Sequence, residues 1–361
     1  MKRRLVRFLT RYYPALTIGI FFLLVFRKVF LQALLPFPGD LLVSFFFPYS
    51  SGGWEGFVQY VAHKEFIASD VVRQIFPWRI LGMDLLKHNE LPLWNPYAFS
   101  GTPLLANLQS ALFYPLNVVF FFLSDRVGWI VYVLLQPILA GSFMFLFLRS
   151  LKLDRPAALF SGIAYGYISY TMIWFELGVV GHTALWLPLT LWGITRFIEE
   201  KKLRFLLVSS IALACSILAG HAQTAVYCFL ISATYFGVFS YKHFPWFQIL
   251  RNSFIFVLAI GLAGIQLFPS LELLSLSARN AETSAEVFYR MQLPFTHLLM
   301  LFAPDYFGNP AANNFWGSDY NEFISYIGIV AVIFSMIGLF HAWKHTRLRY
   351  YSGFVLIALL F

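Results

Sequence analysis

Apolar stretches long enough to cross a bilayer recur along nearly the whole chain. Complete stretches lie near residues 14–35, 127–148, 156–175, 182–198, 205–220, 222–240, 252–270 and 323–342, and another begins at Ser352. About 20 apolar residues cross the hydrocarbon core, and they must be helical there because the backbone has no water to bond. The sequence therefore predicts an all-α polytopic membrane protein with about eight or nine transmembrane helices, forming one domain over residues 1–361 that is incomplete at its C-terminal end.

Composition agrees with this class and argues against nucleic acid as a partner. Hydrophobic residues make up 59% of the chain and charged residues only 12%, which is too few to cover a soluble domain. The net charge is +9, but the basic residues are divided among short loops and do not gather on one face. The lipid bilayer is the partner that this composition predicts.

Basic residues predict the orientation, because Lys and Arg are retained on the cytoplasmic side of a membrane. With the N-terminus inside, most of the 26 basic residues fall in inner segments, including those at 149–155, 196–204 and 242–251. If the apolar stretch Leu104–Leu123 crossed the membrane, these later basic loops would lie outside. We therefore expect Leu104–Leu123 to be re-entrant or interfacial, bent at Pro115 and returning to the outer side at Asp125 and Arg126. The two large outer loops are then 37–112 and 271–322.

Two carboxylates stand out in the first outer loop. Asp40 follows the first span, and Asp70 opens an amphipathic run that also carries Arg73 and Arg79. Either carboxylate fits a turn or helix start, or a general base that accepts the proton of an attacking hydroxyl. The two arginines could neutralise a leaving phosphate or form ordinary surface ion pairs.

The rest of this loop is rich in aromatic and amide side chains held by proline and glycine. Flat apolar faces and amide hydrogen bonds suit sugar recognition, although an interfacial aromatic belt has a similar composition. The candidate substrate contacts here are Trp94, Asn95, Tyr97, Asn107 and Gln109.

Two Gly-His pairs and the last outer loop supply further candidates. His182 and His221 each follow a glycine near an expected helix start, where a phosphate or hydroxyl could bind; turn residues at the membrane interface are the alternative. In the loop at 271–322, Tyr289, Arg290 and Asp305 are the candidate substrate contacts.

No motif for nucleotide binding, zinc hydrolysis or serine hydrolysis occurs in the sequence. The two cysteines, Cys215 and Cys228, lie in apolar stretches without metal-ligand spacing. The sequence therefore predicts no cofactor, and ligand spacing gives a divalent metal no support.

The segments SDVVRQIFPWR (69–79) and PLWNPYAFSGTPLLANLQSALFYPLN (92–117) resemble the first loop of the YfhO-type bacterial membrane proteins. FAPDYFGNP and YNEFISYIG, later in the chain, are similar to that family as well, and the PLWNP block is the most specific part. The family is regarded as resembling the GT-C glycosyltransferases, which have many spans and a long first outer loop carrying an Asp.

This resemblance implies a transferase of the bacterial plasma membrane. It would move a sugar from a polyprenyl phosphate to an outer-surface acceptor such as a teichoic acid, a glycolipid or a polysaccharide. The loop Asp would be Asp70, with Gln74 and Trp78 on the same run as substrate contacts, and Asp40 is the rival. Family members usually continue with more spans and often an outer domain, which puts acceptor recognition by this chain in doubt.

A transporter or flippase of lipid-linked substrates, without transferase activity, is the alternative function. Such a protein is expected to carry ionisable residues or broken helices near the bilayer midplane. Within the predicted spans, the chain offers mainly Gln136 beside Pro137, and Gln266 shortly before Pro269.

Overall fold

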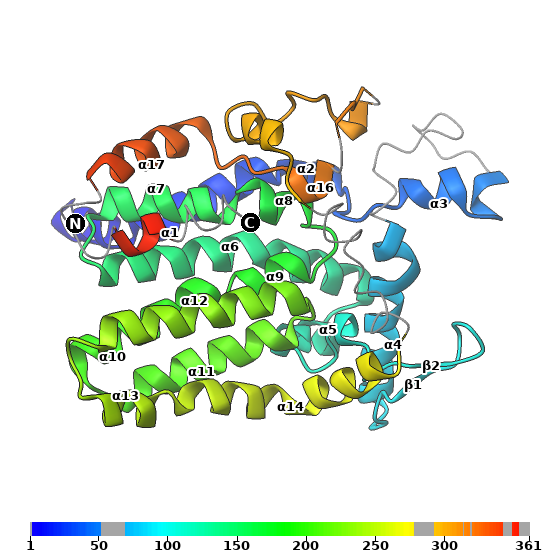
Figure 1. Ribbon diagram of the computed structural model, residues 1–361. Helices are drawn as coiled ribbons and strands as arrows, with labels where there is room; N and C mark the ends of the chain where they lie inside the picture. The colour runs from blue at the N-terminus through cyan, green and yellow to red at the C-terminus, as the bar shows by residue number, and fades with distance from the viewer. Residues whose placement is uncertain are drawn as a thin grey trace.

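The computed structural model describes residues 2–51, 69–277, 292–312, 314–317, 320–341 and 349–353. Regular structure in these residues is almost entirely helical, with one small antiparallel sheet of two strands. The long helices lie side by side in a bundle, as Figure 1 shows. The predicted all-α class is confirmed.

Nine helices form the bundle in the described residues. They are α1 (Lys2–Val25), α6 (Asp125–Ser150), α7 (Arg155–Gly166), α10 (Leu187–Glu200), α11 (Leu203–Leu218), α12 (Ala222–Ser240), α13 (Trp246–Asn252), α14 (Phe254–Ser275) and α17 (Ile329–His341). Within the part of the chain that the structure describes, three stretches are long and apolar enough to cross a membrane: Asp125–Ser150, Ala222–Ser240 and Trp246–Ser275. The larger count of eight or nine spans stays a prediction.

Besides the first span, 14–35, which is divided between α1 and α2 (Arg27–Gln32), two of the predicted spans are divided into separate helices. Residues 156–175 form most of α7 and then α8 (Ser169–Ile173), and residues 182–198 belong to α9 (Val180–Ala184) and α10. Proline marks the second break, since Pro188 occupies the first turn of α10, where its missing N–H costs no helical hydrogen bond. Continuous apolar sequence therefore did not reveal these interruptions.

Helices α6 and α7 approach each other through glycines. A Cβ atom added to Gly162 would lie 2.7 Å from the carbonyl oxygen of Gly141, and one added to Gly166 would lie 2.7 Å from that of Pro137. Gly162 and Gly166 are four residues apart, so they share one face of α7. Small residues at this spacing let membrane helices pack backbone to backbone.

The loops that are rich in basic residues gather at one end of the bundle, which we call the basic end. Figure 1 places the N-terminus and the α6–α7, α10–α11 and α12–α13 connections there. At this end, Arg196, Lys202 and Arg204 surround Glu200, and the hydrogen bond from Lys202 is the main cause that lowers the pKa of Glu200. The segments that charge bias assigns to a single side of the membrane thus lie together.

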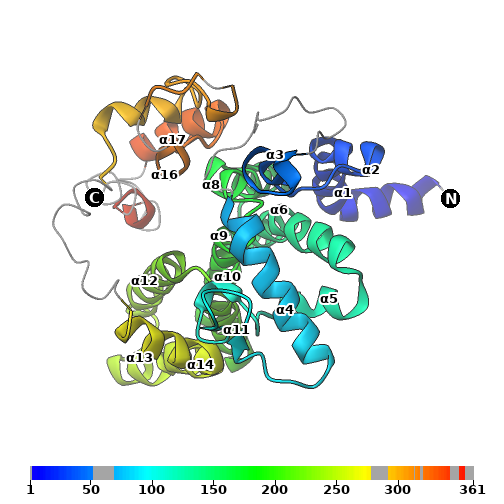
Figure 2. The same ribbon diagram turned by 90° about the vertical axis from the view of Figure 1, so that its right-hand side faces the viewer.

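The opposite end, called the α4 end, is built from short elements. They are α2 (Arg27–Gln32), α3 (Asp40–Phe45), η1 (Tyr49–Ser51), the π-helix η3 (Val71–Ile75), α4 (Phe76–Lys87), β1 (Trp94–Asn95), β2 (Thr102–Pro103), η4 (Leu108–Ser110), η5 (Pro115–Val118), α5 (Val119–Phe122), η7 (Phe295–Leu301), η8 (Pro310–Ala312) and α16 (Tyr320–Phe323). In the sheet, Trp94 pairs with Pro103 and Asn95 with Thr102. Helix α4 lies across this end of the bundle (Figure 2).

The stretch Leu104–Leu123 does not form a spanning helix. It is fully described, and its longest helices have four residues each: η5, which begins at Pro115, and α5. A new short helix thus begins at Pro115, and α6 starts at Asp125. The re-entrant or interfacial placement of this stretch stays a prediction.

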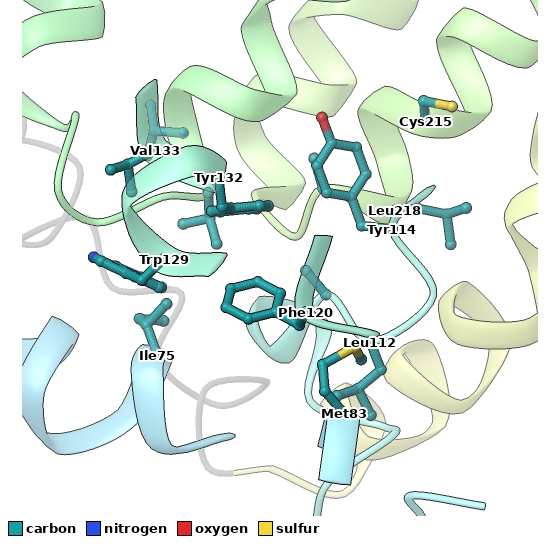
Figure 3. Close-up of a cluster of buried hydrophobic side chains, with 14 of the residues drawn as sticks. Ile75, Met83, Leu112, Tyr114, Phe120, Trp129, Tyr132, Val133, Cys215 and Leu218 are labelled. Carbon is teal, nitrogen blue, oxygen red and sulfur yellow. The ribbon is translucent and has the colours of Figure 1, made fainter. Parts of the chain in front are cut away.

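A core of aromatic and aliphatic side chains attaches α4 to the bundle. Figure 3 shows Ile75 and Met83, from the η3–α4 segment, beside Phe120, Trp129 and Tyr132. All five are at most 2% exposed. At about 1.5–3 kcal/mol for each large apolar side chain removed from water, this contact is sufficient to hold α4 in a fixed position across the end of the bundle.

Candidate active site

Asp70 lies where the π-helix η3 begins at the α4 end. The apolar side chains Val71 and Ile75 of η3 are 1% exposed and face the core, whereas Asp70 is half-buried and Arg73 is exposed. Asp70 makes no capping hydrogen bond to the described residues of η3, which weakens its interpretation as a helix cap. Short π-helical segments are rare and are frequent at functional sites.

The surroundings of Asp70 stabilise the protonated form of its carboxyl group more than bulk water would. Burial raises the pKa of Asp70, and the positive charge of Arg73 partly offsets this increase. A carboxylate with a raised pKa is a stronger base when it is ionised, and the nearby guanidinium can attract an anionic group. The pair therefore has the properties required for proton transfer beside a phosphate.

Asp40, the rival carboxylate, lies on a different element at the same end. It is the first residue of α3, following Gly39, and its side chain is partly exposed. In Figure 2, α3 lies near α1 and α2 and close to the end at which α4 begins. The structure thus brings both carboxylates to the α4 end.

Arg79 is completely buried. This position does not fit the predicted direct contact with a phosphate at the surface. Its Cζ atom lies 4.2 Å from the ring centre of Tyr132 and 5.9 Å from that of Trp129. One nitrogen, Nη1, donates to the carbonyl oxygen of Gly178 at 3.5 Å. Nε and Nη2 have no hydrogen-bond partner among the described residues. The aromatic faces therefore supply much of the stabilisation of this cation.

His182 is also fully buried, and its predicted role as a phosphate contact does not fit its surroundings. Nδ1 lies 3.0 Å from the hydroxyl of Tyr114, and Nε2 lies 3.0 Å from the carbonyl oxygen of Tyr132. A carbonyl can only accept, so we assign the proton to Nε2, and the Tyr114 hydroxyl then donates to Nδ1. Trp186 donates in turn to Tyr114 at 3.0 Å. His182 thus connects α9 to α6 and the loop before η5.

His221 has a different environment from His182, so the two Gly-His pairs are not a structural repeat. It precedes α12, and its Nδ1 accepts from the backbone N–H of Thr224 at 3.3 Å and lies 2.7 Å from the hydroxyl oxygen of Thr224. Burial lowers the pKa of His221. Its Nε2 has no hydrogen-bond partner in the part of the chain that the structure describes. His221 can therefore offer a neutral N–H donor to a ligand.

A pocket of about 450 Å³ brings His221 together with two predicted contacts from the first loop. We call it the amide pocket. Its polar lining residues are Asn107, Gln109, His221, Gln223, Ser270 and Ser277. Sequence reasoning missed the last three. Gln223 could have been found as the next polar residue after His221, but no pattern distinguishes the two serines from others in the chain.

Gln266 and Gly220 fix the walls of the amide pocket. The side chain of Gln266, in α14, donates to the carbonyl oxygen of Leu108 at 3.1 Å and accepts from the N–H of Phe113 at 3.4 Å. Gly220 has φ +102°, and an added Cβ would lie 2.9 Å from the carbonyl oxygen of Leu108. Only glycine permits both this backbone conformation and this close approach. The loop around Leu108 is therefore held against α14 and the start of α12.

Comparison with known proteins identifies the family. The family described as "Bacterial membrane protein YfhO" matches residues 107–361, which is more than half of the chain. The chain belongs to the YfhO family. The match includes Asn107, Gln109 and His221 of this YfhO-family protein and begins after Asp70 and the PLWNP block. No curated protein and no solved structure matches the chain.

Other predicted contacts of the YfhO-family protein lie outside the amide pocket. Trp94, in β1, and Tyr97, between β1 and β2, are 53% and 84% exposed. Asn95 is buried and accepts from the backbone N–H of Tyr97 at 2.9 Å, so it shapes the turn. Trp78 packs against the core beneath α4. Asn95 and Trp78 thus contact other parts of the protein, and this does not fit their predicted role as substrate contacts.

Gln74, the fourth residue after Asp70, lies within η3 and is partly buried. It shares η3 with Arg73, and Asp70 immediately precedes this helix. A role in binding substrate stays a prediction.

The candidates in the last outer loop are only partly within the described residues. Asp305 accepts hydrogen bonds from the Tyr320 hydroxyl and the Asn309 amide, each at 3.0 Å. These bonds connect the loop at 305–309 to α16. Tyr289 and Arg290 lie outside the described residues. Within the described part of the YfhO-family protein, no group of three or more His, Cys, Asp or Glu residues is placed to hold a metal ion.

Proposed function

We propose that this YfhO-family protein is a membrane glycosyltransferase. It takes a sugar from a polyprenyl phosphate and transfers it to an acceptor at the extracytoplasmic face of the bacterial plasma membrane. The acceptor is a teichoic acid, a glycolipid or a polysaccharide. The observation that carries this proposal is the half-buried Asp70, with its raised pKa, beside Arg73 at the end of the bundle opposite the basic loops. Because basic loops are retained in the cytoplasm, the α4 end faces outward.

The chemistry follows from these two groups. An acceptor hydroxyl gives its proton to the Asp70 carboxylate as its oxygen forms a bond to the anomeric carbon of the donor sugar. The bond from that carbon to the phosphate oxygen breaks, and the electron pair leaves with the polyprenyl phosphate. Arg73 stabilises the charge that develops on the phosphate. Asp40 is the second candidate for the base.

A reconstituted transfer assay tests the proposal. The full chain in lipid vesicles is supplied with a polyprenyl-phosphate hexose and a mixture of envelope glycolipids and glycopolymers. We expect protein-dependent formation of glycosylated acceptor, with one polyprenyl phosphate released for each sugar transferred. Movement of intact donor between leaflets without any transfer would support the flippase instead.

The two glutamines within predicted spans give the flippase little support. Gln136 donates to the carbonyl oxygen of Phe175 at 2.9 Å, and Gln266 bonds the loop around Leu108. Each glutamine therefore holds a neighbouring segment in place. An ion-coupled transporter instead needs ionisable groups exposed to a pathway through the membrane.

The dependence of the rate on pH should identify Asp70 and Arg73 as partners. The base must be ionised, so activity falls as pH decreases through the pKa of Asp70, which burial holds above its usual value. The charge of Arg73 lowers that pKa, so Arg73→Ala should raise it and move the acidic limb of the profile to higher pH. The measurement is transfer rate against pH for both proteins. An acidic limb at the same pH in Arg73→Ala would show that the two groups are not coupled.

A further inference from the structure

The amide pocket lies where three segments meet at the α4 end. The loop around η4 forms one wall, the residues from Gly220 to Gln223 form a second, and the C-terminal part of α14 forms the third. Its volume of about 450 Å³ falls within the range of roughly 300–1,000 Å³ typical of small-molecule sites. Residues far apart in the sequence thus build one site of ligand size.

The polar side of the amide pocket offers both donors and acceptors. Nε2 of His221 is a donor, and Asn107, whose Oδ1 accepts from the N–H of Gln109, still has its amide hydrogens. The hydroxyl groups of Ser270 and Ser277 donate to backbone carbonyls of their own helix turn, so their oxygens can accept from a ligand. Sugar hydroxyls need neighbouring donors and acceptors of this kind.

None of the described residues that line the amide pocket is an acidic residue, a lysine or an arginine. A phosphate or carboxylate placed there would lose water without gaining an opposite charge, which is unfavourable. An amine would meet the same difficulty. The lining therefore favours an uncharged, hydroxyl-rich ligand over the phosphate of the sugar donor.

The other side of the amide pocket is a row of leucines. Leu267, Leu271 and Leu274 follow one another at helical spacing along α14. Leu271 and Leu274 are 52% and 49% exposed. This helix belongs to the stretch Trp246–Ser275, which is long and apolar enough to cross a membrane. An exposed leucine row at its C-terminal end is suited to contact with lipid. A ligand with a sugar headgroup and a hydrocarbon chain would satisfy both sides.

We propose that the amide pocket binds the uncharged glycan headgroup of a membrane glycolipid, with the lipid chain lying along the leucine row of α14. The glycolipid is the acceptor, a role that rests on the function proposed above. Its glycan hydroxyls bond the side chains of Asn107, Gln109 and His221. The donor phosphate binds separately, beside Arg73.

A lipid-binding experiment tests this site without requiring catalysis. The full chain in phosphatidylcholine nanodiscs is titrated with dihexosyl diacylglycerol, and the bound lipid is measured by native mass spectrometry. Leu271→Trp fills the amide pocket, and Gln109→Ala removes an exposed amide. Leu262→Trp is the matched control, because Leu262 is 47% exposed on the same helix and outside the described lining of the pocket.

We expect Leu271→Trp and Gln109→Ala each to weaken glycolipid binding at least tenfold, and Leu262→Trp to leave it unchanged. Phosphatidylglycerol and the free disaccharide should each bind at least tenfold more weakly than the glycolipid. Equal binding of either probe, or unchanged binding by Leu271→Trp, would overturn the proposal.

The same titration separates this site from the proposed catalysis. If transfer fails in every assay but glycolipid binding still depends on Leu271 and Gln109, the binding site stands and the transferase proposal fails. If transfer proceeds while the pocket variants bind and react normally, the site proposed here fails alone.

Discussion

Replacing Asp70 with asparagine should lower the rate of sugar transfer by about 10²–10⁴-fold, the usual contribution of a general base. Asparagine has nearly the same shape as aspartate but cannot accept the proton of the acceptor hydroxyl. Since Asp70 is half-buried and makes no capping hydrogen bond within the described part of η3, the fold should be retained. The measurement is the initial rate of transfer from polyprenyl-phosphate hexose by the purified full chain.

Two matched variants make this result specific. Asp84→Asn removes a carboxylate from α4 whose side chain is 63% exposed, and it should transfer sugar at the normal rate. Asp40→Asn tests the rival carboxylate on α3. Full activity in Asp70→Asn, together with loss in Asp40→Asn, would assign the base to Asp40 and remove Asp70 from the mechanism.

Replacing Gly162 with alanine should destabilise the bundle by about 1–3 kcal/mol, which is typical of overpacking in a filled interior. The added methyl group would lie 2.7 Å from the carbonyl oxygen of Gly141. That oxygen belongs to the backbone of α6, so relief requires the two helices to move apart. The free energy of unfolding can be measured by titrating the purified protein from mild detergent into sodium dodecyl sulfate.

Gly237→Ala provides the control for backbone effects of alanine. Gly237 lies in α12, and an added Cβ there would meet no atom within 4 Å. Because alanine favours a helix over glycine by about 0.5–1 kcal/mol, this variant should be equally stable or more stable. A similar loss of stability in both variants would refute the close packing of α6 on α7 as the cause.

The fold class and the path of one ambiguous segment were predictable because each depends on a local property. Long apolar stretches have one favourable environment, and this determined the helical class. Leu104–Leu123 is apolar enough to cross, yet the positions of the basic loops excluded a crossing. The structure agrees, with only short helices around Pro115. Backbone breaks such as the one between α9 and α10 leave a weaker signal, because the residues around them are also apolar.

The arrangement of the candidate site could be predicted less well, because burial depends on tertiary packing. His182 and His221 have the same neighbour, glycine, but His221 lines the amide pocket, whereas His182 is enclosed by Tyr114 and Tyr132. Arg79 looked similar to Arg73 in the sequence, yet it points into the core. The meeting of Asn107 with His221 depends on Gln266 and Gly220, whose contacts with the loop have no sequence signature.

The buried position of Arg79 affects how the α4 end responds to ionic strength. Dissolved ions screen an exposed cation such as Arg73 over a Debye length of about 8 Å in physiological salt. They cannot approach a guanidinium that is sandwiched against Tyr132 and closed off from water. The contact between Arg79 and Tyr132 should therefore depend far less on salt concentration than any ion pair that Arg73 makes. Added salt would weaken attraction to the exposed cation first and leave this link between α4 and α6 unchanged.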